Sequence, residues 1–119
     1  RPVEPGETVG YDGIFLAKRK TKVATICIGY GDGLCEQFVS AGSPVLVGNK
    51  LARYIGICMD QSFIDVTGID CDIGDEVTIF GKSSTGAVLP PQKLAATVGH
   101  EGVYFTSQLS SRVERRYIY

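Results

Sequence analysis

Short apolar runs separated by glycine-containing turns dominate the first half of the chain. Residues 7–11 and 14–17 have the pattern of two short strands on either side of Gly13. Residues 23–28 are nearly all apolar and rich in β-branched side chains. A run of this kind is typical of a strand buried on both faces. The first 28 residues therefore predict three strands.

The second half continues the same pattern. Residues 44–57 predict a hairpin, because two apolar stretches flank a Gly-Asn pair of the kind that two-residue turns favour. Residues 61–66 alternate as a half-buried strand does, and 76–80 form another apolar stretch. A helix is predicted only over 91–98, where Pro begins the segment and Gly follows it.

Two later segments are less defined. Residues 102–109 fit neither pattern, and 116–119 are a candidate closing strand. Seven or so short strands with regularly spaced turns predict a mostly β fold. We expect a small antiparallel β-barrel or sandwich with one or two short helices, formed by residues 1–119 as a single domain.

Composition narrows the classes of function. The charged share is 21% and the net charge is −1, so the overall charge gives no reason to expect nucleic acid or an anionic membrane as a partner. The chain begins at Arg1 without a Met, which we take as the sign of a domain cut from a longer protein. No apolar run approaches the roughly 20 residues that span a bilayer.

The cysteines and the histidine do not suggest a metal site. Cys27, Cys35, Cys58 and Cys71 form no CxxC pair, and His100 does not stand at ligand spacing from them. Their apolar neighbours predict small buried thiols in a reducing compartment, so we expect a cytoplasmic protein. His100 follows the predicted helix, where a surface or capping role is the usual one.

Tyrosines are the more interesting candidates. Tyr11 stands at a strand end between glycines, and Tyr30 lies inside the Gly-Tyr-Gly-Asp-Gly motif of residues 29–33. A phenol has a pKa near 10, so it becomes a useful base only beside positive charge. From local sequence alone, packing at a strand end is the more common reason for a tyrosine at position 11. Three glycines around Tyr30 predict a backbone that needs a positive φ or a close approach to another group.

Five segments together resemble the C-terminal domain of alanine racemases. They are residues 5–11, the motif at 28–33, Ile-Cys-Met-Asp-Gln at 57–61, Gly-Asp-Glu-Val at 74–77, and Ser-Arg-Val-x-Arg at 111–115. Each is weak alone, but their order and spacing match over essentially the whole chain. The resemblance implies a homodimeric enzyme dependent on pyridoxal 5'-phosphate. In that family, the N-terminal barrel domain of one subunit and the C-terminal domain of its partner form each active site.

The resemblance also implies roles for single residues. Tyr11 matches the catalytic tyrosine on the face of Cα opposite the cofactor lysine, and inverting that carbon requires an acid/base group on each face. Tyr30 matches a second tyrosine that lines the approach to the cofactor. Met59 matches the residue whose backbone amide meets the substrate carboxylate, and Asp60 lies beside it. The barrel domain holds the lysine and most of the phosphate contacts, so this chain alone is expected to be inactive.

Three departures bear on the substrate. Gly56 stands where the family usually has an arginine, Glu36 stands where an arginine is frequent, and Ser111 replaces a tyrosine whose hydroxyl helps hold the cofactor phosphate. Serine is smaller than tyrosine but keeps a hydroxyl. In having serine at position 111, the chain resembles the serine-accepting racemases, including the racemase part of membrane-bound enzymes linked to vancomycin resistance. The resemblance thus implies alanine or serine as the substrate, for peptidoglycan precursors. The membrane-bound relatives leave two parents open, a cytoplasmic protein or a membrane-anchored one with this domain on the cytoplasmic side.

Two other interpretations remain open at this stage. A small β-barrel binding module would use the basic turn formed by Lys18, Arg19, Lys20 and Lys22. Such turns are usually solvated, and the aromatic side chains expected between the charges of single-strand binders are missing. Alternatively, the domain is structural and contributes no active-site residue.

Overall fold

The fold is known from a computed structural model that describes the whole chain except residues 11–12, 14 and 119. Its elements in chain order are β1 (Pro2–Val3), β2 (Thr8–Val9), β3 (Phe15–Leu16), β4 (Thr21–Ile26), the 3₁₀ helix η2 (Tyr30–Asp32), α1 (Phe38–Ala41), β5 (Pro44–Val47), β6 (Lys50–Ile57), β7 (Ser62–Asp65), β8 (Val77–Thr78), β9 (Gly81–Lys82), β10 (Val88–Leu89), α2 (Pro91–Ala96) and α3 (Gly102–Gln108).

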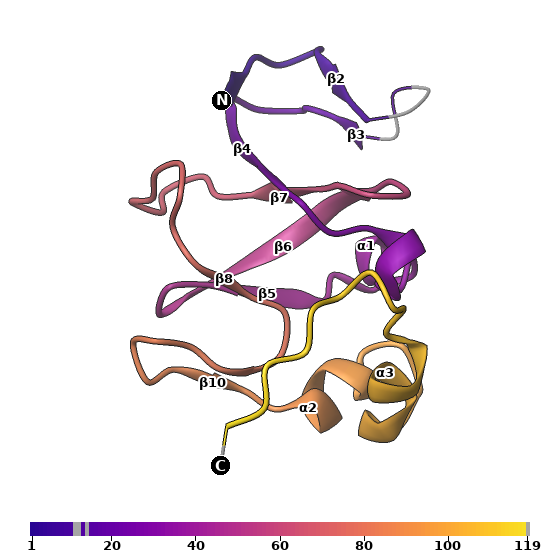
Figure 1. Ribbon diagram of the computed structural model, residues 1–119. Coiled ribbons are helices and arrows are strands. Elements are labelled where there is room, and N and C mark those ends of the chain that lie inside the picture. The colour runs from indigo at the N-terminus through magenta and orange to yellow at the C-terminus, as the bar shows by residue number, and fades with distance from the viewer. Residues whose placement is uncertain (11–12, 14, 119) are drawn as a thin grey trace.

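Six strands form one antiparallel sheet in the order β1-β4-β7-β6-β5-β8 (Figure 1). Two short antiparallel pairs, β2-β3 and β9-β10, accompany it. The prediction of a mostly β, antiparallel domain with few short helices is confirmed. Within the described part of the chain these sheets do not close into a barrel, so the sandwich-like alternative is the one observed.

Two hairpins form the centre of the sheet. The predicted hairpin of residues 44–57 is confirmed, with Val47 paired to Lys50 across the Gly48-Asn49 turn. The next hairpin joins β6 to β7 through a turn in which the Cys58 N–H donates to the Gln61 carbonyl at 2.8 Å. The register shifts between Tyr54 and Gly56, so β6 carries an irregularity before this turn.

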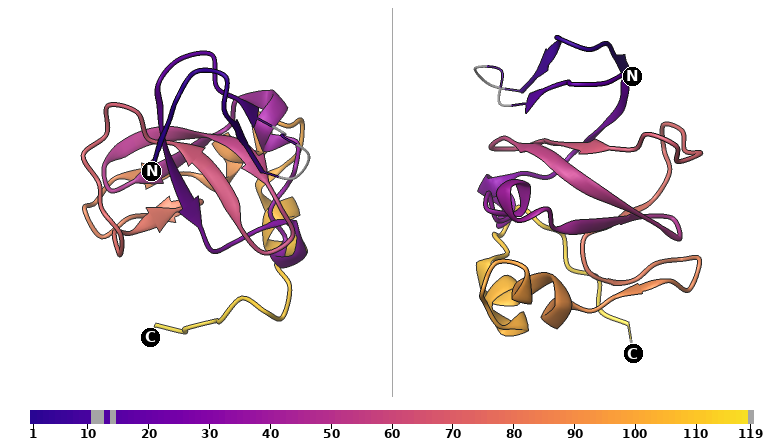
Figure 2. Two further views of the ribbon diagram at one scale, coloured as in Figure 1. Left: turned by 90° about the horizontal axis from the view of Figure 1, so that it is seen from above. Right: turned by 180° about the vertical axis from the view of Figure 1, so that it is seen from behind.

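Apolar side chains are buried on both faces of the sheet. The larger cluster lies between the sheet and the helices, and the smaller one lies beneath the β2-β3 hairpin. The view from behind shows this arrangement, with the hairpin on one side of the sheet and α2 and α3 on the other (Figure 2). The smaller cluster comprises Val3, Val9, Ala17, Val23 and Ile55, with Phe15 and Phe63 packed against it.

Strand β4 takes part in both clusters, as a strand covered on both faces should. Val23 belongs to the smaller cluster and Ile26 to the larger one. The coverage is incomplete, because Thr25 and Cys27 are exposed. The prediction of buried thiols is therefore wrong for Cys27, although Cys58 is buried. Cys27 lies just beyond the last residue of β4, and both it and Thr25 are exposed.

The helices are short. Helix α2 confirms the prediction for residues 91–98 over six residues, and α3 gives the undecided segment 102–109 a helical structure. Helix α1 is one turn long and has no signal in the sequence pattern. Residues 116–118 are not a strand. Among the described residues, the helices are all too short or too polar to cross a membrane.

Candidate functional site

Three segments that are distant in sequence meet at one end of the sheet. They are the glycine loop (residues 29–33), the β6–β7 turn (residues 58–61) and the C-terminal segment (residues 109–115). The N–H of Tyr30 donates to the Cys58 carbonyl at 2.9 Å, and the N–H of Gly31 donates to the Met59 carbonyl at 2.8 Å. The glycine loop is therefore fixed to the β6–β7 turn by its backbone. We call this meeting point the junction.

The glycines of the loop are required by close approach. A Cβ added at Gly29 would overlap the backbone carbonyl of Cys58. Gly33 has a φ of 109°, and a Cβ there would overlap the backbone of Gln108 and lie 3.0 Å from Cα of Leu109, the first residue of the C-terminal segment. The prediction that this loop needs a positive φ or a close approach is confirmed, and both conditions occur. The loop thus packs against both of the other segments.

The junction displays Tyr30 and Met59 at the surface. Their exposed fractions are 44% and 50%, and Asp60 next to Met59 is also exposed. Large apolar side chains that are exposed together on a surface often mark the place where a ligand or a partner binds. The backbone beneath Tyr30 and Met59 is fixed by hydrogen bonds, so these two side chains are suited to such a contact. Three sequence-predicted site residues, Tyr30, Met59 and Asp60, are therefore brought together.

Beneath the exposed side chains lies a carboxylate that sequence reasoning did not single out. Asp32 is 6% exposed, and its Oδ2 accepts a hydrogen bond from the Gly29 N–H at 3.0 Å. Its Oδ1 lies 3.3 Å from Nε of Arg112. The only sequence signal is an acid placed inside a glycine motif. The partner, 80 positions later, has no local signal at all.

The C-terminal segment is the third side of the junction. The N–H of Ser110 donates to the Asp32 carbonyl at 3.1 Å. Arg115 folds back on its own segment and donates to the carbonyls of Leu109, Ser110 and Val113 at 2.6–3.1 Å. Ser111 is exposed and lies between two residues that contact the glycine loop. The structure therefore places Ser111 on the stretch of the C-terminal segment that contacts the glycine loop.

Tyr11, the predicted catalytic residue, lies outside the described residues. The base of its hairpin is described: the Gly6 N–H donates to the Ala17 carbonyl at 2.8 Å, and the Ala17 N–H donates to the Glu7 carbonyl at 2.9 Å. Val9 is buried against the sheet. The role of Tyr11 stays a prediction.

Tyr54 is a titratable group that sequence reasoning missed. It is 2% exposed, stacks on Phe38 with ring centroids 5.3 Å apart, and its hydroxyl has no hydrogen-bond partner among the described residues. Burial raises the pKa of Tyr54 well above its ordinary value. The phenol therefore stays protonated in the core and is not a candidate base.

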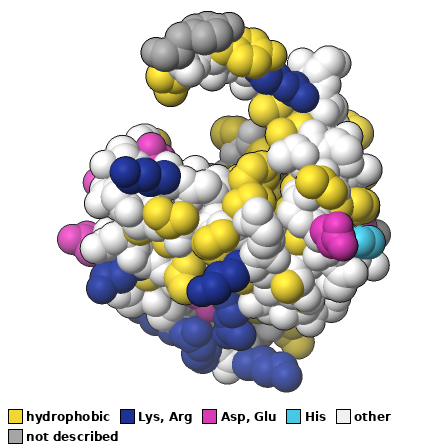
Figure 3. All heavy atoms as spheres, turned by 90° about the horizontal axis from the view of Figure 1, so that it is seen from below, with side chains coloured by type: hydrophobic (Ala, Val, Ile, Leu, Met, Phe, Trp, Pro, Cys, Tyr) yellow, Lys and Arg dark blue, Asp and Glu magenta, His cyan; other side chains and the backbone are white. Residues whose placement is uncertain are grey.

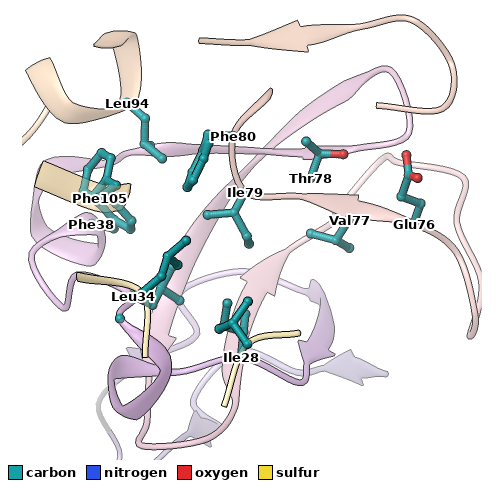
Figure 4. A pocket seen from close by; sticks show the side chains of 13 residues that line it. Ile28, Leu34, Phe38, Glu76, Val77, Thr78, Ile79, Phe80, Leu94 and Phe105 are labelled. Carbon is teal, nitrogen blue, oxygen red and sulfur yellow. The ribbon is translucent and has the colours of Figure 1, made fainter. Parts of the chain in front are cut away.

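A cavity of about 300 Å³ lies between the sheet, the helices and the C-terminal segment. Figure 4 shows hydrophobic side chains converging on it, among them Ile28, Phe80 and Phe105, with Glu76 and Thr78 at one side. Among the residues that the structure describes, no Lys or Arg lines it, so these residues do not suit a phosphate group. From below, hydrophobic side chains are also visible on the surface of the face that carries α2 and α3 (Figure 3).

The described residues hold no metal cluster, and three of the four basic side chains of the turn have partners within the chain. Across the described ranges, no group of three or more His, Cys, Asp or Glu side chains is placed to bind an ion. In the basic turn, Arg19 pairs with Asp65 at 3.1 Å, and Lys22 donates to two backbone carbonyls. Lys20 lies 3.9 Å from Glu4. Because these three basic side chains already have partners within the chain, they are less available to a ligand, which counts against the binding-module interpretation. His100 is exposed and stacks on Tyr104.

Comparison with known proteins gives a consistent result. The family model "Alanine racemase, C-terminal domain" matches residues 1–117. An alanine racemase of Acinetobacter baumannii is 36% identical, and one of Vibrio cholerae is 37% identical; the matches cover 94% and 98% of this chain. The crystal structure of the biosynthetic alanine racemase from Pseudomonas aeruginosa matches the whole chain with a TM-score of 0.86 and 33% identity. The chain spans about a third of the length of these relatives (31–32%).

Proposed function

Because the chain belongs to the alanine racemase C-terminal domain family, we propose that residues 1–119 work as the C-terminal domain of a pyridoxal 5'-phosphate-dependent amino-acid racemase. Its reaction interconverts the L and D forms of alanine, serine or both, for peptidoglycan precursors. The single observation that carries the proposal is the junction. There the glycines of the loop pack so closely against neighbouring backbone that a Cβ would overlap it, and the side chains of Tyr30 and Met59 are exposed.

In this proposal, the junction is the substrate-facing wall of the active site. The backbone amide of Met59 meets the substrate carboxylate, with Asp60 beside it and the ring of Tyr30 lining the approach. Met59 and Asp60 lie in the turn of a hairpin, and the strand residues Ile57 and Ser62 on either side of that turn are paired with each other. The Ser62 hydroxyl also donates to the Ile28 carbonyl at 2.6 Å, just before the glycine loop. These contacts support a wall that holds its shape when substrate arrives.

Tyr11 holds or moves a proton on one face of the substrate Cα. Its phenol needs neighbouring positive charge to act as a base near neutral pH. We propose that the partner subunit's barrel domain supplies that charge and the acid/base group of the opposite face. The active enzyme is therefore a homodimer in which each C-terminal domain completes the site of its partner.

The described residues fit one wall of a cofactor site and do not form a complete one. Ser111 and Tyr30 are exposed hydroxyl-bearing residues on segments that contact Asp32 and Arg112, whereas no Lys or Arg among the described residues lines the cavity. We propose that the barrel domain holds most of pyridoxal phosphate and that Ser111 contacts its phosphate side. When bound, the cofactor supplies the electron sink that makes the Cα proton removable.

Serine is part of the proposal because of Ser111. A serine at this position leaves more volume than a tyrosine and keeps a hydroxyl near the substrate side chain. A hydroxymethyl group then has both space and a hydrogen-bond partner. Pockets that differ by one small group discriminate by only roughly 10–200-fold. We therefore propose that alanine and serine are both accepted.

The proposal is tested by comparing this domain with the full-length protein. The domain alone should show no racemisation of alanine or serine and no stoichiometric labelling of a lysine after pyridoxal phosphate and borohydride. The full-length protein should racemise and should be labelled at a lysine outside residues 1–119. Labelling of a single lysine within this domain, or a full-length protein without racemase activity, would contradict the proposal.

A further inference from the structure

The carboxylate of Asp32 is shared between two segments of the junction. Oδ2 accepts from the Gly29 N–H at 3.0 Å, and Oδ1 faces Nε of Arg112 at 3.3 Å. The Asp32 side chain is almost wholly buried, whereas the Arg112 side chain is 56% exposed. One buried charge therefore connects the loop that displays Tyr30 with the segment that carries Ser111.

Further contacts hold the same two segments together. The Asp32 carbonyl accepts from the Ser110 N–H at 3.1 Å, so the carboxylate and the backbone of Asp32 both contact the C-terminal segment. A Cβ at Gly31 would lie 3.2 Å from Cγ of Met59 and 3.6 Å from Nη1 of Arg112. The Arg112 guanidinium therefore lies beside the part of the loop that faces Met59.

We propose that Asp32 and Arg112 are a positioning pair that sets where Ser111 lies relative to Tyr30 and Met59, and thereby sets substrate affinity and side-chain preference. The inference rests on the proposed function. Neither residue takes part in proton transfer in this assignment. The pair acts through the three residues that face the substrate.

The structure separates this role from a general role in stability. Arg115 already holds the C-terminal segment in shape through three carbonyls of that segment. Loss of the exposed Arg112 side chain therefore leaves the segment folded and the core untouched. What it removes is the side-chain connection between the segment and the glycine loop. The hydrogen bond from the Ser110 N–H to the Asp32 carbonyl remains, so Ser111 is held less firmly relative to Tyr30.

The test uses the full-length enzyme with Arg112→Gln, Arg112→Lys and the control Arg116→Gln. Arg116 directly follows this segment, and its ion pair is local, with Glu114 at 3.2 Å. We expect Arg112→Gln to raise KM for alanine about tenfold, since small misplacement of binding groups is costly. Its kcat should stay within about threefold of the unmodified enzyme on the same reasoning. Its serine-to-alanine ratio of kcat/KM should also change, Arg112→Lys should recover part of both effects, and Arg116→Gln should show neither.

Asp32→Asn keeps an acceptor for the Gly29 N–H and removes the charge. Combined with Arg112→Gln, it should raise KM no further than the larger single effect, because the two residues act as one unit. If Asp32→Asn does not fold, the Arg112 series decides alone.

The outcomes are distinguishable. A full-length protein without racemase activity means that the proposed function fails. An active protein in which Arg112→Gln matches Arg116→Gln in KM and in substrate ratio overturns the positioning pair alone. A fall in kcat with unchanged KM, or additive effects of the two substitutions, overturns it as well.

Discussion

The β2-β3 hairpin and the junction are held in place in different ways. Each strand of the hairpin has two residues, and its described anchors are two backbone hydrogen bonds at its base and a small apolar cluster. The junction is fixed by backbone hydrogen bonds among three segments and by the ion pair between buried Asp32 and exposed Arg112. This chain therefore places Tyr30 and Met59 by itself. In the proposed enzyme, we expect the partner subunit to supply the remaining contacts of the hairpin.

The largest effect should come from the hairpin, through Tyr11→Phe in the full-length enzyme. A positioned acid/base group contributes roughly 10²–10⁴-fold to a rate, so we expect racemisation to fall by that factor. Removal of one hydroxyl should change stability by only about 1 kcal/mol. The measurement is racemisation in both directions together with thermal unfolding.

The loss should also be asymmetric. Exchange of the Cα proton with solvent should fail for one enantiomer and persist for the other, because the acid/base group of the opposite face is intact. If both exchange rates survive in Tyr11→Phe, the hairpin does not carry the catalytic group, and the contrast with the junction loses its functional meaning.

The next effect should come from the junction, through Gly29→Ala. Its Cβ would overlap the Cys58 carbonyl, so we expect a loss of about 3 kcal/mol in unfolding free energy, at the upper end for overpacking. Gly6→Ala near the hairpin is the matched control. Gly6 has a φ of 92° and open space around it, so only backbone strain of about 1 kcal/mol is expected there. Urea unfolding measures both, and equal losses would mean that the junction is no more tightly packed than the hairpin base.

Ser111→Tyr should sharpen the comparison at the proposed active site. Filling the volume beside the junction should lower the serine-to-alanine ratio of kcat/KM by about tenfold, within the limit for a single small group. The new hydroxyl should reach the cofactor phosphate, so affinity for pyridoxal phosphate should not fall. An unchanged or increased ratio would place substrate choice elsewhere, with the hairpin as the next region to examine.

The smallest effect should come from Tyr54, which belongs to neither region. Tyr54→Phe removes a buried hydroxyl without a described partner, so we expect a gain of about 1 kcal/mol near neutral pH. Burial raises the pKa of Tyr54 above its ordinary 10.0, so above pH 10 the unfolded chain ionises while the folded chain keeps its proton. Stability should therefore fall as pH rises above 10, and Tyr54→Phe should lack that component. A steeper alkaline loss in Tyr54→Phe would contradict this.

The sequence predicts the elements that local rules determine. Residues 44–57 form the hairpin expected from their turn, and α2 begins at the proline that predicts it. Helix α1 is a single turn, too short for periodicity to appear, and its formation depends on burial of Phe38 in the larger cluster. Cys27 has the apolar neighbours of a buried residue but is exposed, just beyond the end of β4. Such differences depend on tertiary packing, which local patterns do not encode.

The candidate site divides in the same way. The glycine motif predicts a close approach, which is a local property of the backbone, and the structure confirms it. The ion pair between Asp32 and Arg112 joins residues 80 positions apart, and the local sequence around each residue does not predict the pairing. The positions of Tyr30 and Met59 on one surface also depend on the fold. The resemblance to a family, and not the residue pattern alone, is what relates these segments to one another.

The shared backbone of the junction has a consequence for protein engineering. The β6–β7 turn and the C-terminal segment occupy the space that side chains would need at Gly29, Gly31 and Gly33 of the glycine loop. The three segments therefore fit one another closely. A chimaeric racemase that receives only one of the three from a relative would combine surfaces that were never selected together. Transfer of a substrate preference between family members therefore calls for exchanging all three segments at once, with the intervening sheet retained as the scaffold.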